Sequence, residues 1–264
     1  GGREGMMTGM QMAELAMRTI APVFERRDVT SFREMSASLD TLEFDGRKLH
    51  PSVCYGASQA VLDAVARCQG LTPAEVVARE YALTMADAPV RIHTQSGDDR
   101  YVNVDKMILK QAGFMPHGLI NNAAEKIGKN GEIFLGYAKW VRDRVLDIGA
   151  KDYRPAFRFD VYGTLGEEFD NDPARIVDFL AKVRAVTEPF DLFIEMPVDM
   201  GSGDAQLRVM REIRHGLRAK NLHVGLIIDE YANTLEEIKA WADSDACDMV
   251  QVKTPDLGAL HNSV

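Results

Sequence analysis

The sequence contains little cysteine. Cys54, Cys68 and Cys247 are the only cysteines among 264 residues; they are odd in number and widely spaced, and no Cys-x-x-Cys pair occurs. Such usage does not suit the disulfide framework of a small secreted protein. We therefore expect a reduced, cytoplasmic setting.

Long apolar runs and an excess of positive charge are also missing. The longest purely apolar stretches are only a few residues, far below the ~20 that a spanning helix needs, and no signal-peptide pattern opens the chain. The formal net charge is -9 and the pI is near 5.2. Because nucleic acids and anionic membranes need a cationic partner surface, we expect neither as a partner.

The composition is that of an ordinary globular protein, with 46% hydrophobic and 27% charged residues. At this length we expect one large domain, or one and a half. The chain starts at Gly1 without an initiator methionine and stops after His261-Asn262-Ser263-Val264, where a helix should begin. We therefore interpret it as an internal fragment.

The first third has a helical pattern throughout. From about residue 8 to residue 81, apolar residues recur at helical spacing, and Thr72-Pro73-Ala74-Glu75 has the form of a capping box with proline at the first helical position. No catalytic group stands out in this part. We expect residues 1–88 to form a helical packing layer.

Near residue 89 the period changes to strands that alternate with helices, which is typical of parallel βαβ units. Residues 89–264 therefore predict an α/β fold, a TIM-type barrel with six strand units where a closed barrel needs eight. The carboxyl ends of all strands in such a barrel converge on one mouth. Polar residues end the six predicted strands: Gln95, His117, Asp160, Glu195, Asp229 and Lys253.

Three of these strand ends are acidic and follow one another in successive units. Asp160, Glu195 and Asp229 are about 35 residues apart, so they would come from neighbouring strands at one level. Three hard oxygen ligands on a rigid frame suit Mg²⁺, and without a cation the carboxylates would repel one another. Solvated surface charge is the alternative interpretation.

The remaining strand ends predict acid-base and binding groups. Lys253 should face inward beside Gln251, and a neutral amine is plausible next to a divalent cation. His117 would lie across the mouth as a second acid-base group. Gln95 and Gln251 suit a substrate carboxylate, although either could simply cap a strand. The other histidines are expected to be structural or exposed: His50, His93, His215, His223 and His261.

Asp, Glu and Asp on consecutive strands with a lysine on the next resemble the enolase superfamily, whose sites combine Mg²⁺ with a Lys or His base. Longer motifs make the chain similar to the methylaspartate ammonia-lyase family over essentially its whole length. The motifs that carry this resemblance are QSGDDRY with NVDKM, PHGLINN, FDVYGTLG, IEMP, DEYANT, VQVKTPDLG and, in the helical third, RKLHPSVCYGASQAVLDAVA.

The resemblance implies a role for each matched position. It assigns the magnesium ligands to Asp160, Glu195 and Asp229, the base to Lys253, a second catalytic group to His117, and substrate binding to Gln95 and Gln251. It implies reversible elimination of ammonia from L-threo-3-methylaspartate to mesaconate through an enediolate, with Mg²⁺ and possible use of a monovalent cation such as K⁺. The segments IEMPVDMGSGD and LGALHNSV depart from the family's pattern.

The resemblance also implies a homodimer, a preceding β-rich part of the capping domain and two further barrel units. We therefore expect that these 264 residues alone do not turn over substrate. Two alternatives remain at this point. One is another enolase-superfamily enzyme, such as a racemase, epimerase or cycloisomerase, although Met115-Pro116-His117 stands where those families commonly carry Lys-x-Lys. The other is a non-catalytic fragment.

Overall fold

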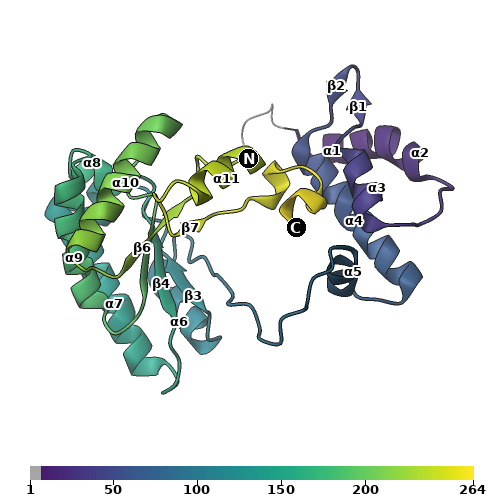
Figure 1. Cartoon of the computed structure of the whole chain (residues 1–264). Coiled ribbons are helices and arrows are strands. Elements are labelled where there is room, and N and C mark those ends of the chain that lie inside the picture. The colour runs from purple at the N-terminus through teal and green to yellow at the C-terminus, as the bar shows by residue number, and fades with distance from the viewer. Residues whose placement is uncertain (1–6) are drawn as a thin grey trace. The chain divides into compact units, whose positions relative to one another are not determined.

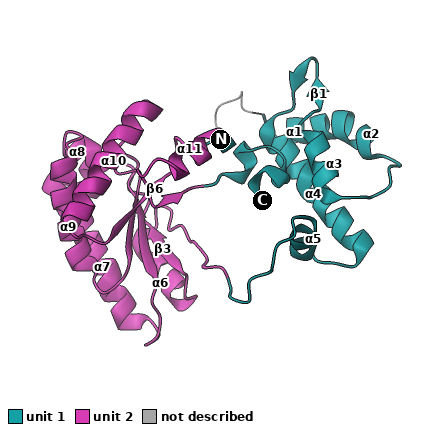
Figure 2. Cartoon of the chain, viewed as in Figure 1, with its two compact units in different colours: residues 1–89, 233–235, 252–264 teal, residues 90–232, 236–251 magenta. Residues whose placement is uncertain are grey.

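The computed structural model describes residues 7–264, which divide into two compact units (Figure 2). The first unit ends at residue 89 and also includes residues 233–235 and 252–264. The second comprises residues 90–232 and 236–251. The division at residue 89 lies where the sequence pattern changes, and residues 252–264, which the sequence pattern assigns to the barrel, group with the first unit.

The first unit is mainly helical, as its sequence pattern predicts (Figure 1). The predicted capping box begins its last long helix: the Glu75 carboxylate accepts from the Thr72 N–H at 2.7 Å, and the Thr72 hydroxyl accepts from the Glu75 N–H at 3.3 Å. A short hairpin, β1 (Glu43–Phe44) with β2 (Arg47–Lys48), interrupts the helices. The helical elements are α1 (Gly9–Leu15), the π-helical turn η1 (Ala16–Ile20), α2 (Ala21–Phe24), α3 (Phe32–Leu39), α4 (Pro51–Gln69) and α5 (Pro73–Glu80).

The segment 252–264 is attached to this unit by hydrogen bonds to α4 and to the end of α3. The Asp40 carboxylate accepts from the Ala259 N–H at 3.1 Å and from the Asn262 side-chain amide at 2.7 Å. The Ser58 hydroxyl accepts from the Leu260 N–H at 2.8 Å. The segment contains two short 3-10 turns, η4 (Thr254–Asp256) and η5 (Leu260–Ser263). Because these contacts satisfy the backbone N–H groups at the start of η5, the segment belongs to the helical packing layer.

The second unit is a parallel sheet in the order β3-β4-β5-β6-β7, with α7, α9 and α10 packed side by side (Figure 1). Strand and helix alternate, as expected for an α/β barrel. Among residues 7–264, no helix is long and apolar enough to cross a membrane. The strands are β3 (Phe114–His117), β4 (Ala156–Asp160), β5 (Leu192–Glu195), β6 (Val224–Ile228) and β7 (Met249–Val250). The helical elements are α6 (Arg100–Leu109), η2 (Ala123–Ile127), η3 (Lys129–Gly131), α7 (Glu132–Ile148), α8 (Thr164–Glu168), α9 (Pro173–Thr187), α10 (Gly203–Ala219) and α11 (Leu235–Ala242).

The strand predicted before Gln95 is only an isolated bridge between His93 and Phe114. The N–H of Thr94 donates to the Phe114 carbonyl at 3.1 Å, and the N–H of Ser96 donates to the Pro116 carbonyl at 3.1 Å. Pro116 has no N–H to donate in return, so a regular parallel ladder cannot continue. The segment therefore follows β3 without becoming a sixth strand of the sheet.

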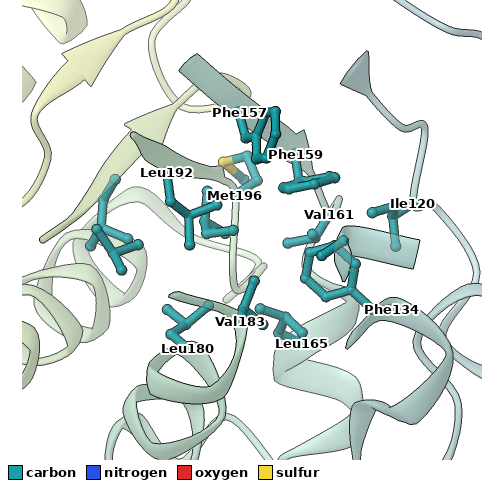
Figure 3. Close-up of a cluster of buried hydrophobic side chains, with 14 of the residues drawn as sticks. Ile120, Phe134, Phe157, Phe159, Val161, Leu165, Leu180, Val183, Leu192 and Met196 are labelled. Carbon is teal, nitrogen blue, oxygen red and sulfur yellow. The ribbon is translucent and has the colours of Figure 1, made fainter. Parts of the chain in front are cut away.

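Side chains alternate along the strands, and this alternation separates core from site. In β4, Phe157 and Phe159 pack among the helices, whereas Arg158 and Asp160 point to the other face. Figure 3 shows the two phenylalanines in one apolar cluster with Phe134 from α7. All five β4 residues are buried, so this strand is covered on both faces. The core thus fixes which side chains remain for chemistry.

We predict that Gly131→Ala destabilises the second unit by about 2–5 kcal/mol. Gly131 has a left-handed φ of 82° at the start of α7, and an added Cβ would overlap the Phe179 ring. A left-handed alanine costs about 1–2 kcal/mol and overpacking about 1–3 kcal/mol. Urea unfolding measures the loss. The matched control is Gly136→Ala in the same helix. A Cβ at this position meets nothing within 4 Å, so the substitution should stabilise the helix by about 0.5–1 kcal/mol. Equal effects of the two changes would contradict this account.

Candidate metal centre

Two acidic side chains meet at the carboxyl ends of neighbouring strands. Asp160 ends β4 and Glu195 ends β5, and the register pairs the two residues directly. Both are buried, with exposed fractions of 3% and 1%. Because the register is fixed by the apolar residues that alternate with them, the packing of the outer face holds the carboxylates next to each other.

His117 joins these carboxylates through an unusual backbone conformation. The register pairs His117 with Phe159, whose side chain lies in the core, so regular alternation would turn the imidazole toward the helices. Its φ is 68°, in the left-handed region that histidine adopts more often than most residues. The ring instead lies with its Nε2 3.2 Å from Asp160 Oδ2.

His117, Asp160 and Glu195 form a buried group suited to hold a metal ion, since one ligand atom from each lies within 4.8 Å of the others. The pKa of Glu195 is raised to about 7, mainly by burial and to a smaller extent by the negative charge of Asp160. The Arg158 guanidinium opposes this rise, and Asp229 adds to it. The negative charge of Asp160 thus acts against ionisation of Glu195, which is the charge arrangement expected of residues that hold a cation.

Arg158 is a site residue that we did not predict from the sequence. It is buried, its Nε donates to Glu195 Oε2 at 2.8 Å, and its Nη2 forms an ion pair with the same oxygen at 2.6 Å. Nη2 also donates to Gln251 Oε1 at 2.9 Å. The sequence does contain an indication of this role. An arginine inside the apolar strand FRFD must be buried on one face, and buried arginines are almost always paired.

His93, which is predicted from the sequence to be structural or exposed, also lies at this centre. Its ring is 5.8 Å from that of His117, edge to face, and its Nε2 is buried. Burial lowers its pKa to about 4, and the positive charge of Arg158 contributes to this lowering. His93 is therefore neutral at physiological pH. It stands two residues before Gln95, and this spacing in the predicted strand indicates that the two side chains face the same side.

The other predicted residues are placed less directly. Asp229 follows β6, is 9% exposed, and acts electrostatically on Glu195, but it is not among the three residues grouped within 4.8 Å. Gln251 follows β7 and contacts Arg158. Gln95 is exposed, between Thr94 and Ser96, whose N–H groups bond to the β3 backbone. Their roles in substrate and metal binding stay predictions.

The strand predicted to deliver Lys253 ends earlier than expected. β7 stops at Val250, Val252 is 43% exposed, and Lys253 precedes the turn that contains Pro255. The last backbone bond to β6 is from the Gln251 N–H to the Ile228 carbonyl, and the chain leaves the sheet after this residue. Lys253 falls in the first unit, whereas the metal centre lies in the second, so its role as a base stays a prediction.

The donor set fits a divalent cation. Two buried carboxylates lie side by side, and the negative charges of Asp160 and Asp229 both act on Glu195. Carboxylate oxygens suit Mg²⁺, and the His117 imidazole adds a nitrogen donor that suits transition metals. Asp160 and Glu195 would therefore hold the ion, with Asp229 as the predicted third ligand.

Comparison with protein-family models covers almost the whole chain. Residues 1–82 match the model described as methylaspartate ammonia-lyase N-terminus, and residues 84–264 match methylaspartate ammonia-lyase C-terminus. The chain belongs to the methylaspartate ammonia-lyase family. Membership in this family argues against the predicted alternative of a racemase or cycloisomerase.

Curated relatives agree with this assignment. The chain is 41% identical over 263 residues to methylaspartate ammonia-lyase of Clostridium tetanomorphum and 40% identical over 265 residues to that of Citrobacter amalonaticus. These alignments cover 99% and 100% of the chain. The chain spans 64% of the length of each relative.

Solved structures extend the comparison to the fold. The structure of beta-methylaspartase from Clostridium tetanomorphum, described as a Mg complex, superimposes with a TM-score of 0.94 at 41% identity, covering 100% of this chain and 64% of the other. Muconate cycloisomerase from Pseudomonas fluorescens superimposes with a TM-score of 0.65 at 15% identity, covering 100% and 64%. The second likeness concerns the fold alone, which is the α/β barrel type predicted from the sequence.

Removing one carboxylate from the centre should weaken binding of a divalent cation. We predict that Asp160→Asn lowers Mg²⁺ affinity at least about tenfold, because a charge pair at contact distance is worth about 4 kcal/mol at an effective dielectric constant of 20. Isothermal titration calorimetry measures the change. Asp152→Asn, an exposed acidic residue of the same unit, is the matched control and should leave affinity unchanged. Unchanged affinity in Asp160→Asn would remove this residue from the site.

The cation-free protein should lose stability as pH rises through about 7. The folded pKa of Glu195 is raised above that of an ordinary carboxyl, so folding favours its protonated form. The contribution of Glu195 to the unfolding free energy is fully present below about pH 4 and is lost as the pH increases through the folded pKa. We expect the unfolding free energy of the wild type to fall relative to that of Glu195→Gln when the pH is raised from 5 to 8 in the presence of a chelator. A difference independent of pH would show that Glu195 has an ordinary pKa.

Proposed function

We propose that this chain carries the metal centre and general base of an enzyme that reversibly eliminates ammonia from L-threo-3-methylaspartate to give mesaconate. The buried group of His117, Asp160 and Glu195, in a chain of the methylaspartate ammonia-lyase family, is the observation that supports this function most directly. Because the chain spans 64% of its relatives, the proposal concerns the whole protein of which these residues form the catalytic part.

The reaction removes a weakly acidic proton from C3, which lies α to a carboxylate, and expels ammonia from the neighbouring carbon. A Mg²⁺ ion held by Asp160, Glu195 and Asp229 would supply positive charge where negative charge develops on that carboxylate. Lys253 is the proposed base. It follows β7 and stands two residues after Gln251, which faces the interior with Arg158.

His117 is the proposed second acid-base group. Its Nε2 lies 3.2 Å from the Asp160 carboxylate, and its Nδ1 is buried. Its neutral form carries a proton on one nitrogen only, so it can either take or give a proton at C3. On the face of the substrate opposite Lys253, it would act on the other C3 epimer or stabilise the charged intermediate.

Gln95 and Gln251 are proposed to donate hydrogen bonds to the substrate carboxylates. For Gln251 this assignment has a chemical basis. An arginine has only donors, so the Gln251 atom that faces Arg158 is the carbonyl oxygen, and the NH₂ group is left for another acceptor. We further propose a cytoplasmic homodimer, with a small amino acid as substrate and K⁺ as a possible second ion.

Solvent deuterium exchange tests the division of labour between the two bases. In this chain extended by its flanking coding sequence, Lys253→Ala should abolish exchange at C3 of L-threo-3-methylaspartate, and His117→Ala should mainly affect the other epimer. Mass spectrometry follows the exchange, and ultraviolet absorbance follows mesaconate. Lys151→Ala, an exposed lysine, is the control. Equal losses for both epimers in both variants would contradict the proposal.

A further inference from the structure

Arg158 connects two strands that are not neighbours. It stands in β4 and bonds Gln251, which follows β7, while β5 and β6 lie between them. In a flat sheet, strands three apart are separated by about 14 Å. The direct bond at 2.9 Å shows that the two long side chains meet over β5 and β6, on the face of the sheet that carries Glu195.

The position of Arg158 in the register explains how it meets Glu195. Its partner in the ladder is Phe193, so Glu195 lies one inward-facing position further toward the carboxyl ends of the strands. Arg158 thus lies below the level of the carboxylates and reaches up to one of them. A residue at this level can hold the groups that line the mouth without occupying the mouth itself.

The pattern of bonds selects particular atoms. Nε donates a hydrogen bond to Glu195 Oε2 and Nη2 lies in ion-pair contact with the same oxygen, so these contacts do not use Oε1. On Gln251 the bonded atom is the amide oxygen, so its NH₂ group is not used by Arg158 either. One planar donor group therefore contacts both the carboxylate predicted to bind the metal ion and the amide predicted to bind substrate.

We propose that Arg158 is a positioning residue that sets the orientation of Glu195 toward the metal ion and of Gln251 toward the substrate. The first part concerns only cation binding, and the second rests on the proposed function. The planar guanidinium is needed for both because it presents several donors in a fixed plane, whereas a lysine ammonium acts as a point charge.

A role in charge balance alone makes the opposite prediction. If Arg158 only offset the negative charge of the carboxylates, its removal would leave a more negative centre and Mg²⁺ would bind more tightly. If Arg158 positions Glu195, its removal releases the carboxylate and Mg²⁺ binds more weakly. Loss of groups that hold metal ligands in place typically weakens affinity about 10- to 100-fold.

The first experiment is calorimetric titration of the 264-residue chain with Mg²⁺ alone. Arg158→Met should bind Mg²⁺ at least about tenfold more weakly, and Arg158→Lys should fall between it and wild type. Arg154→Met is the matched control: it makes the same change at an exposed arginine just before β4 and should leave affinity unchanged. Unchanged or tighter binding in Arg158→Met would overturn the proposal, as would a wild type that binds no Mg²⁺.

Circular dichroism and thermal unfolding show whether each variant folds. If Arg158→Met does not fold, Arg158→Lys decides the question, because it keeps the charge but cannot reproduce the planar pair of contacts. Affinity equal to wild type in Arg158→Lys would then show that charge suffices and would overturn the positioning role.

A double-mutant cycle in the extended, active protein tests the link to Gln251. Arg158→Lys should raise KM more than it lowers kcat, and this effect should largely disappear in a Gln251→Leu background, because both changes remove the same oriented amide. Additive effects on KM would contradict the link. If no ammonia-lyase activity is found while Mg²⁺ affinity still depends on Arg158, the proposed function fails and the positioning of Glu195 stands.

Discussion

The structure of the candidate site depends on one electrostatic constraint: two carboxylates are buried side by side at the ends of neighbouring parallel strands. Asp160 and Glu195 are in register, and burial, followed by the negative charge of Asp160, raises the pKa of Glu195 to about 7. A folded protein retains such a pair only if other groups compensate. Arg158 supplies one compensating charge through Glu195, and His117 contacts Asp160. The centre is therefore organised to accept further positive charge, which a divalent cation would provide.

The outer face of the same sheet makes this arrangement rigid. Phe157 and Phe159 alternate with the two inward-facing residues of β4, and a register shift would bury the charged side chains among the helices. Packing thus determines the distance between the carboxylates, while the bond from Arg158 to Gln251 connects β4 to the residue that follows β7. The same strands therefore supply core residues on one face of the sheet and site residues on the other.

Much of this arrangement could be predicted from the sequence. Acidic residues at the ends of apolar runs gave the positions of Asp160 and Glu195, and the period change near residue 89 gave the division of the chain. Three features depended on backbone geometry and could not be predicted: Pro116 prevents a further strand beside β3, β7 ends before Lys253, and the left-handed φ of His117 turns its ring toward Asp160. Arg158 was predictable in principle from its place within FRFD.

The most direct test of the central claim is to locate a bound divalent cation. Crystals of the protein grown with Mn²⁺, which binds oxygen-rich sites much as Mg²⁺ does, allow the ion to be identified by its anomalous scattering. We predict one strong peak in contact with the carboxylates of Asp160 and Glu195, with the Asp229 carboxylate completing the protein ligands and Arg158 still bonded to Glu195. A peak elsewhere, or no peak at saturating Mn²⁺ with both carboxylates ordered, would contradict the metal centre described above.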